Sequence, residues 1–384
     1  MKVLWVSEVE PDPNSGAGGT ELLMVQKLRE AGHLVHTVWA DDLVRRIGHG
    51  NLHYAFELPK TYWRAIQAAC RNASFDVVTV NLGQSFLACR KLRSEGFKGA
   101  FIVRSHGLDD HLDVVMGEWE TRLRIPKRPP LKRATGSLLK VILHRHMRLA
   151  AQCCDGYVVS SSLDADWLQK THGMNPDRVA VIPQSPAAVF CETEPPAMSK
   201  HRLRRLLYAA NFHYAKGPEL VAKSATSLLS RYADLEMTWI CHPADHAKVL
   251  GLLDNSIQER VRLLGWMPQH ELVEQFDQHG IFLYPSLFDG FGKVFLEAMS
   301  RGLCVVGTRA GGMVDLIKDG KNGFLCEFND ADQMISIVQR ILNDPEKAQA
   351  ISDAATMTAR EHTWERVARE LSAFFESRLA VVQS

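Results

Sequence analysis

The chain has 384 residues, with 45 Lys or Arg and 44 Asp or Glu, so its formal net charge is only +1. This balance excludes a protein that binds nucleic acid mainly through its overall positive charge. The 46% share of hydrophobic residues is enough for a large buried core, which excludes a disordered or collagen-like chain. The sequence contains no run of the ~20 apolar residues that a membrane-spanning helix needs.

The N-terminal segment 1–8 has one positive charge and only a short apolar run before an acid, which is too brief for a secretory signal peptide. The eight cysteines are scattered and form no C-x-x-C pair. This pattern favours reduced core thiols over a disulfide framework or a zinc site, and we expect no metal. We therefore expect a cytoplasmic protein that is soluble or rests on a membrane surface.

In the first half of the chain, short β-branched and apolar runs alternate with stretches of helical periodicity, as in parallel α/β folds. A buried strand is expected at residues 2–7, followed by an amphipathic helix at 20–30. Further strands are expected at 33–40, 77–81, 100–104, 156–160 and 179–183. Together these elements predict a doubly wound, Rossmann-like domain over residues 1–190.

A polar, proline-containing segment at residues 191–200 has the composition of an interdomain linker. A second alternation of strands and helices follows it and predicts another Rossmann-like domain over 201–362. Its strands are expected at 205–209, 236–241, 261–264, 281–284, 304–307 and 323–326. Open parallel sheets bind ligands beyond the carboxyl ends of their strands, so we expect a ligand cleft between the two domains.

The strongest chemical signal lies at residues 284–299, where a strand end, a glycine-bearing loop and a helix starting near Lys293 follow one another. Gly290 and Gly292 allow backbone N–H groups to approach a ligand, and the helix start favours an anion such as a diphosphate. Asp289 and Glu297 flank this anion site. Because carboxylates repel phosphate, we expect them to accept hydrogen bonds from sugar hydroxyls. The alternative is an ordinary strand–turn–helix with glycines for turn geometry.

This segment resembles the E-x7-E motif of retaining GT-B glycosyltransferases of the family-4 type, also called glycosyl transferases group 1. The motif stands here as Asp289-x7-Glu297. Other segments along nearly the whole chain resemble the same family in the same order. They are residues 16–21 with 31–35, 104–107, 215–217, 264–268, 310–315 and 319–325.

The resemblance implies a GT-B fold, α/β in class, with two Rossmann-like doubly wound domains facing across a cleft. The N-terminal domain would hold the acceptor and the C-terminal domain the nucleotide-sugar donor. The last helix, residues 363–384, would pack back toward the N-terminal domain. The implied activity is a retaining, hexosyltransferase-type transfer from a nucleotide-diphosphate sugar, with the donor as substrate and no cofactor.

The resemblance also implies roles for single residues. Lys216 would neutralise the diphosphate leaving group, Asp289 would hold the transferred sugar, and His106 would sit beside the reacting sugar, so these three form the catalytic set. Glu297 would bind the donor ribose, and Met267 would lie near the nucleobase. Backbone groups near the sugar and phosphates would come from Gly18, Gly19, Gly290, Phe291, Gly292, Lys293 and Val294.

The chain departs from the family pattern at several positions. Asn211 stands at the donor-site position where the family has its first phosphate-binding cation, and His213 or Lys293 could supply another charge. Asp289 is one methylene shorter than the usual Glu. Residues 182–187 read IPQSPA, with Gln184, where the family often has IPNGVD. These departures support a second hypothesis, a degenerate, noncatalytic nucleotide-sugar-binding protein.

A third hypothesis is an NAD-dependent oxidoreductase. The glycines at 16, 18 and 19, with Asp41 or Asp42 as the ribose acid, partly match a dinucleotide fingerprint. However, Glu21 occupies the third glycine position. Residues 8–19 also separate the expected strand from the expected helix, where a tight turn is needed. The fingerprint therefore gives this hypothesis little support.

The segment 122–148 is basic and contains no acid. Its nine cations are Arg122, Arg124, Lys127, Arg128, Lys132, Arg133, Lys140, Arg145 and Arg148. With the apolar residues between them, they predict an amphipathic segment that contacts an anionic membrane or a phosphorylated acceptor. The alternative is a solvated helix face with a flexible loop at 126–130. The membrane reading implies a lipid-linked acceptor at the inner face of the cell membrane. Independently of this segment, the family resemblance implies a glycan or lipid-linked acceptor in bacterial envelope polysaccharide synthesis.

Overall fold

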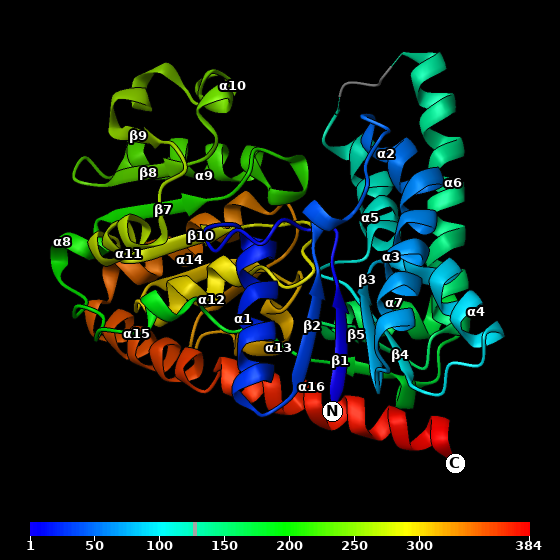
Figure 1. The fold of residues 1–384 in the computed structure, drawn as a ribbon. Coiled ribbons are helices and arrows are strands. Elements are labelled where there is room, and N and C mark those ends of the chain that lie inside the picture. The colour runs from blue at the N-terminus through cyan, green and yellow to red at the C-terminus, as the bar shows by residue number, and fades with distance from the viewer. Residues whose placement is uncertain (126–128) are drawn as a thin grey trace. The chain divides into compact units, whose positions relative to one another are not determined.

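The computed structural model describes residues 1–125 and 129–384, which form two compact units. Unit 1 comprises Met1–Pro183 and Trp364–Ser384, and unit 2 comprises Gln184–Thr363. Within the described residues, each unit contains one six-stranded parallel sheet with helices packed on it (Figure 1). The predicted pair of doubly wound, Rossmann-like domains is thereby confirmed.

The sheet of unit 1 has the strand order β2-β1-β3-β4-β5-β6. Each strand lies inside the range predicted for it. The strands β3, β4 and β5 are buried on both faces, as is typical of central parallel strands. The strands are β1 (Lys2–Val6), β2 (Leu34–Val38), β3 (Val77–Asn81), β4 (Ala100–Arg104), β5 (Gly156–Val159) and β6 (Val179–Val181).

Helices cover both faces of this sheet, since alternate strand residues point to opposite sides. On one side, Val3 and Trp5 of β1 pack against α1 (Gly16–Glu30) and α16 (Trp364–Gln383). On the other side, the sheet packs against α3 (Leu58–Asn72), α4 (Phe86–Ser94), α6 (Pro130–Cys153) and α7 (Ser162–His172). Two further helices of unit 1 are α2 (Gly50–Leu52) and α5 (Asp109–Arg122).

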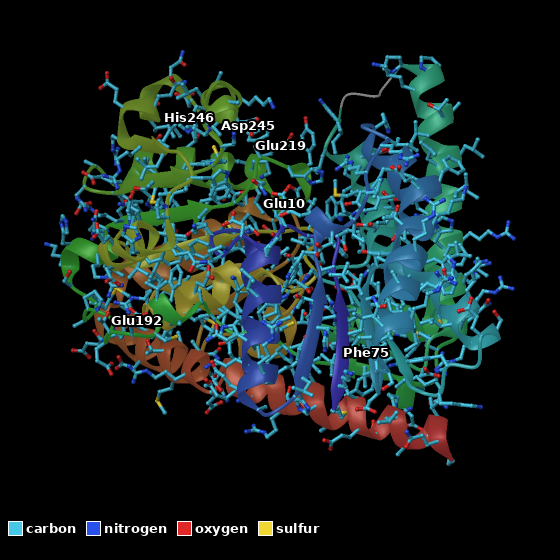
Figure 2. All side chains as sticks on the ribbon, in the orientation of Figure 1. Glu10, Phe75, Glu192, Glu219, Asp245 and His246 are labelled. Atoms are coloured by element: carbon cyan, nitrogen blue, oxygen red, sulfur yellow. The ribbon has the colours of Figure 1, made fainter. Side chains whose placement is uncertain are left out.

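The helix α1 begins at Gly16, four residues before the predicted start. The Ser15 side chain caps it and accepts a hydrogen bond from the Gly18 N–H at 2.7 Å. The preceding loop, which contains Glu10 (Figure 2), packs closely on this turn. A Cβ at Gly18 would lie 2.3 Å from the Glu10 carbonyl oxygen, and one at Gly19 would lie 2.7 Å from that of Pro13. The expected glycine loop is therefore the first turn of a helix.

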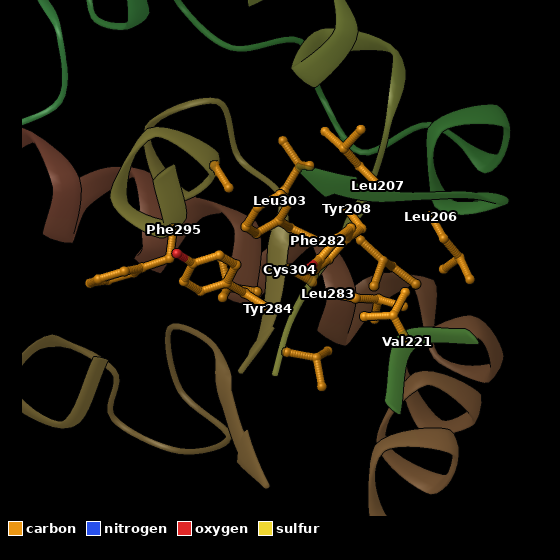
Figure 3. Packing of buried hydrophobic residues seen from close by; sticks show 14 of the residues in the cluster. Leu206, Leu207, Tyr208, Val221, Phe282, Leu283, Tyr284, Phe295, Leu303 and Cys304 are labelled. Carbon is orange, nitrogen blue, oxygen red and sulfur yellow. The ribbon is translucent and has the colours of Figure 1, made fainter. Parts of the chain in front are cut away.

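The sheet of unit 2 has the strand order β12-β11-β10-β7-β8-β9. Its strands are β7 (Arg205–Ala209), β8 (Glu236–Ile240), β9 (Val261–Leu264), β10 (Ile281–Tyr284), β11 (Cys304–Thr308) and β12 (Phe324–Cys326). Figure 3 shows part of the core, in which Phe282 and Tyr284 of β10 lie among residues of β7 and β11.

The helices of unit 2 follow the strands in alternation, as expected for a doubly wound domain. They are α8 (Lys200–Leu203), α9 (Pro218–Arg231), α10 (His246–Leu252), α11 (Gln269–Gln278), α12 (Lys293–Ser300), α13 (Met313–Leu316), α14 (Ala331–Asn343) and α15 (Pro345–Arg360). Among the described residues, no helix is both long enough and apolar enough to cross a membrane.

The segment predicted as a linker is fixed to unit 2. Phe190 is fully buried and packs edge-on against Phe276, with ring centroids 5.5 Å apart. The buried guanidinium of Arg301 donates to the carbonyl oxygens of Phe190 and Thr193, at 3.3 and 2.7 Å, and Arg202 donates to those of 196 and 197. Since these carbonyls are satisfied within unit 2, the structure moves the end of the first domain from residue 190 to 183.

Candidate functional site

In unit 2, the segment around Lys216 packs against the segment that follows β10. The N–H of Leu287 donates to the Ala215 carbonyl oxygen at 2.7 Å. Gly217 has a φ of +68°, and a Cβ at this position would lie 2.2 Å from the Pro285 carbonyl oxygen. Only glycine fits this left-handed backbone and close approach. The turn therefore fixes where Lys216 lies relative to the loop after β10.

The structure brings the predicted residues Lys216 and Asp289 into contact. Lys216 Nζ lies 2.6 Å from Asp289 Oδ2, and the Tyr284 hydroxyl donates to the same oxygen at 2.6 Å. Burial and the Asp289 charge raise the pKa of Tyr284 well above its usual value, so the phenol stays protonated as a donor. The family motifs give Tyr284 no role, although its position at the end of β10 is a signal.

The helix α12 begins directly beside this ion pair. Gly292 precedes its first residue with a φ of +85°, and a Cβ there would lie 3.1 Å from Asp289 Oδ2. The first N–H groups of a helix have no partner within it, which makes the start of α12 suitable for an anion. One turn along, Lys293 Nζ lies 3.5 Å from Glu297 Oε1, and both side chains are about nine-tenths buried.

A neighbouring loop supports the segment 289–292. The N–H of Gly312 donates to the Phe291 carbonyl oxygen at 2.9 Å, and a Cβ at Gly311 would lie 2.9 Å from Asp289 Cβ. The predicted motif 310–315 thus packs directly on the predicted donor segment. The Phe291 side chain is 1% exposed in the core, so only its backbone is left for a ligand. Gly290 is also buried, and Val294 is partly buried.

Other predicted donor residues follow the strands of the same sheet. Asn211 is exposed after β7, and Met267 is partly buried against the core after β9. His213 Nδ1 accepts a hydrogen bond from the Ala215 N–H at 3.1 Å. Desolvation and the Lys216 charge lower the pKa of His213, so its ring is neutral near pH 7. His213 does not replace the missing cation at 211, which leaves Lys293 as the candidate.

In unit 1, the predicted residue His106 is the partly exposed end of a buried polar network. His106 Nε2 lies 2.7 Å from Glu21 Oε1, and Arg104 Nη1 lies 2.6 Å from the same oxygen. The indole N–H of Trp5 donates to Glu21 Oε2 at 2.5 Å. The His106 side chain is 26% exposed, whereas that of Glu21 is 0% exposed.

Sequence reasoning did not identify Glu21 or Arg104 as site residues. A signal was present, because Glu21, Val25 and Leu28 are spaced by four and three residues and share one face of α1. All three are buried, so Glu21 is an acid on a core-facing stripe. Such a residue needs a partner. The partner, 83 positions away in sequence, could not be identified from local pattern.

Gly18 and Gly19 lie at the same end of the unit 1 sheet, in the first turn of α1, where they admit the loop 10–13. The long connection between Val6 and Gly16 is unlike the tight strand-to-helix turn of a dinucleotide fingerprint. This geometry gives the oxidoreductase hypothesis no support. In the described part of the chain, no group of three or more His, Cys, Asp or Glu has the geometry of a metal site.

The basic segment includes the end of α5 and most of α6, with Lys127 and Arg128 outside the described residues. On α6, Leu138 and Val141 are each 64% exposed, and Arg145 and Arg148 are exposed on the same face. Not every cation of the segment is unpaired, because Lys140 Nζ lies 2.6 Å from Asp113 of α5.

Comparison with known families gives two matches that together span most of the chain. Residues 16–185 match the family Glycosyltransferase Family 4, and residues 194–358 match Glycosyl transferases group 1. The first match covers most of unit 1, and the second lies within unit 2.

The similarity to named relatives extends over only part of their length and part of this chain. A D-inositol 3-phosphate glycosyltransferase of Corynebacterium urealyticum is 30% identical over 42% of this chain and 40% of its own length. The protein of the same name from Corynebacterium diphtheriae is 27% identical over 58% of this chain and 56% of its own. The chain spans about half the length of these relatives.

Solved structures match over nearly the whole chain. Sucrose-phosphate synthase from Thermosynechococcus elongatus superposes with a TM-score of 0.74 at 18% identity, covering 99% of this chain and 100% of that one. HepE from Anabaena, in complex with UDP, gives 0.68 at 16% identity, with 98% and 100% covered. The catalytic domain of starch synthase IV from Arabidopsis thaliana gives 0.72 at 12%, with 99% of both chains covered. These matches show that the two units have the GT-B fold.

Proposed function

Because the chain belongs to the group 1, family-4 glycosyltransferases of the GT-B fold, we propose that it transfers a sugar from a nucleotide-diphosphate sugar with retention of anomeric configuration. The acceptor is a glycan or a lipid-linked molecule, and the enzyme is of the hexosyltransferase type. One observation carries the proposal. Lys216 Nζ and the Tyr284 hydroxyl each lie 2.6 Å from Asp289 Oδ2, beside the N-terminus of α12.

The proposed chemistry needs a place for negative charge and a place for sugar hydroxyls. When the bond between the sugar and the diphosphate breaks, negative charge develops on the leaving group, which Lys216 and the first N–H groups of α12 stabilise. Asp289 accepts a hydrogen bond from the transferred sugar. Glu297 binds the ribose and Met267 contacts the base. The acceptor oxygen forms the new bond, and its proton passes to the departing diphosphate.

The residues of unit 1 serve the acceptor side of the reaction in this proposal. His106 hydrogen-bonds a hydroxyl of the reacting sugar. Gly18 and Gly19 let the loop 10–13, which meets the phosphates in this proposal, pack on the first turn of α1. The structures of HepE with UDP and with UDP-glucose support testing uridine donors first. The inositol phosphate in the names of the relatives makes a phosphorylated polyol one acceptor to test.

We place the enzyme in the cytoplasm, with α6 against the inner face of the membrane. The exposed Leu138 and Val141 would enter the interface, and Arg145 and Arg148 would attract anionic headgroups. A lipid-linked acceptor would then be within reach, in keeping with a role in envelope polysaccharide synthesis.

Specific observations also favour a second candidate, a noncatalytic nucleotide-sugar-binding protein. Asn211 removes one cation from the donor site, and the remaining Lys216 is already paired with Asp289. A site with this charge balance can bind a nucleotide diphosphate and still fail to stabilise the charge that develops during transfer.

The experiment is a transfer assay with the full chain, a panel of nucleotide sugars, and glycan, lipid-linked and inositol phosphate acceptors. Release of the nucleoside diphosphate together with an NMR spectrum of the product would show whether the anomeric configuration is retained. Glu297→Ala should lower transfer without unfolding the chain. Nucleotide binding without turnover of any donor would favour the noncatalytic candidate, and inversion would refute the retaining mechanism.

A further inference from the structure

The buried carboxylate of Glu21 receives four hydrogen bonds, all aimed at its two oxygens. Oε1 accepts from Arg104 Nη1 at 2.6 Å, from His106 Nε2 at 2.7 Å and from Asn81 Nδ2 at 3.1 Å. Oε2 accepts from the Trp5 indole at 2.5 Å. The guanidinium, the indole and the amide NH₂ group are donors only. Glu21 must therefore accept from every partner, which is what an ionised carboxylate does.

The charge state of Glu21 agrees with this geometry. Its complete burial alone would raise its pKa, but Arg104 and His106 outweigh that effect and lower the pKa to about 2. At neutral pH the carboxylate is ionised and offers no proton. His106 Nε2 must then carry the hydrogen of the bond that joins them, which leaves Nδ1 as the lone-pair nitrogen of the neutral imidazole.

A second feature of the network is that it leads to one accessible side chain. Trp5 and Glu21 are fully buried, and Asn81 and Arg104 are 1% and 3% exposed, whereas the His106 side chain is 26% exposed. The Arg104 guanidinium also lies 3.5 Å from the centroid of the Trp5 ring, a cation–π contact that helps to hold it in place. Burying an ion pair is a poor way to gain stability, because desolvation offsets the attraction.

We infer that Glu21 is a positioning residue, which fixes the ring orientation of His106 and its Nε2–H tautomer so that Nδ1 acts as a hydrogen-bond acceptor toward the reacting sugar. Arg104, Asn81 and Trp5 hold Glu21 for this task. This inference rests on the proposed function for the role of His106. Its structural part, the tautomer, stands on the geometry alone. A network that served only to hold α1 against β1, β3 and β4 would not need a partly exposed imidazole.

The test is a ¹⁵N NMR spectrum of the histidine rings in the full chain, with His106 assigned by comparison with His106→Asn. We expect neutral wild-type His106 to be the Nε2–H tautomer. In Glu21→Gln the amide cannot accept from all four donors, so we expect a mixture of tautomers. An Nδ1–H tautomer in the wild type would overturn the inference, and this result needs no variant of Glu21 to fold.

The role of Glu21 in transfer is tested by measuring kcat and the KM for the donor. Glu21→Gln should lower kcat by about 10- to 100-fold, as loss of a partner that orients a functional histidine does, and leave the KM for the donor unchanged. Glu21→Asp, which keeps the charge, should recover part of the loss. The matched control is Asp110→Asn, since Asp110 accepts from the buried His172 at 2.7 Å in the same unit.

The control separates positioning from a general loss of stability. Asp110→Asn should leave kcat and the His106 tautomer unchanged. If Glu21→Gln lowers kcat no more than Asp110→Asn does, Glu21 is structural and the inference fails. If the wild type transfers no sugar but shows the Nε2–H tautomer that Glu21→Gln disturbs, the positioning stands and the proposed function fails.

Discussion

The ion pair of Lys216 and Asp289 is the central feature of the proposed donor site, because it joins the two residues proposed for opposite tasks. Their contact at 2.6 Å holds both side chains in place with only 24% and 13% of their side chains exposed. A diphosphate that approached Lys216 would compete with the carboxylate, and Asp289 would then be released to accept from a sugar hydroxyl. Breaking the ion pair between Lys216 and Asp289 would thus couple diphosphate binding to recognition of the sugar.

Replacing Lys216 by Ala tests its proposed role directly. Removing one donor that stabilises charge in the transition state costs about 10²- to 10³-fold in kcat in comparable sites. We expect a loss of this size, with a smaller effect on the KM for the donor, since the leaving-group charge is greatest in the transition state. Initial rates at several donor concentrations would measure both constants.

An exposed lysine of the same unit provides the control for Lys216→Ala. Lys223 lies on α9, and Lys223→Ala should leave the kinetics unchanged. Circular dichroism melts of both variants would show that the fold is retained. Full activity of Lys216→Ala would mean that the positive charge beside Asp289 has no part in transfer.

The Glu21 network predicts a pH dependence of stability. The pKa of Glu21 is about 2 in the folded chain against 4.5 for a free side chain, so its contribution is fully present above pH 4.5 and lost as the pH falls through about 2. The shift corresponds to about 3 kcal/mol. Between pH 5 and pH 2, the unfolding free energy of the wild type should fall more steeply than that of Glu21→Gln. Parallel curves from denaturant titrations would contradict the assignment.

At the scale of structural elements, the turn at Gly217 should be sensitive to any side chain. Gly217→Ala forces a Cβ into a left-handed backbone and toward the Pro285 carbonyl oxygen, 2.2 Å away. We expect a loss of about 1–3 kcal/mol in unfolding free energy from the backbone strain and lower activity as Lys216 moves from Asp289. Denaturant titration and the transfer assay would measure the two effects.

The control for Gly217→Ala is a glycine with open space. Gly251 lies in α10, has an ordinary φ, and has no atom within 4 Å of an added Cβ. Gly251→Ala should stabilise the chain by about 0.5–1 kcal/mol, since alanine favours helix. A Gly217→Ala variant as stable and active as Gly251→Ala would show that the turn can relax.

The helix α6 predicts a measurable affinity for anionic membranes. Each surface cation contributes about 1 kcal/mol to such binding, so Arg145→Gln with Arg148→Gln should weaken it by about 30-fold. Cosedimentation with vesicles that contain phosphatidylserine would measure this, and added salt should weaken the wild type. Lys223→Gln with Arg231→Gln on α9 is the matched double variant. Equal loss in both double variants would exclude a specific α6 surface.

The strands and helix caps show what the sequence could predict at this scale. Strands such as β3 and β10 have the predicted bounds because each is a mostly apolar run with a clear end, at Asn81 in β3 and before Pro285 in β10. The start of α1 was missed, since Ser15 caps the helix before its apolar periodicity begins. The contacts of the segment 191–200 were not predictable, because its carbonyls are bonded by Arg202 and Arg301 from outside the segment. Local composition does not reveal such partners.

The candidate site was predictable only in part, for the same reason. Lys216, Asp289 and Glu297 stand in recognisable motifs, and the structure places the first two in contact. Tyr284 and Glu21 act through distant or packed partners, and their importance follows from hydrogen bonds that close only in the folded chain. Their roles, like those of the predicted residues, are open to the experiments above.

At the scale of the whole molecule, each unit has its own hydrophobic core. The core of unit 1 includes residues of α16 from the C-terminal end of the chain. Trp364, Leu371 and Phe375 of α16 are buried with residues of α1 and the unit 1 sheet. The N-terminal 183 residues alone would therefore expose an apolar face. Ligand experiments consequently need the full chain, in which both units are complete.

The whole chain should be stabilised by the ligand class that the donor site recognises. A ligand that binds only the folded state adds about 2.7 kcal/mol at 100 times its Kd and raises the melting temperature. We expect a selective increase with one nucleoside diphosphate and its sugars, and a smaller one in Lys216→Ala. NAD at the same concentration should have no effect, because the long loop before α1 lacks the tight phosphate-binding turn. If NAD alone raises the melting temperature, or if no nucleotide raises it, the proposal of a nucleotide-sugar site in unit 2 is contradicted.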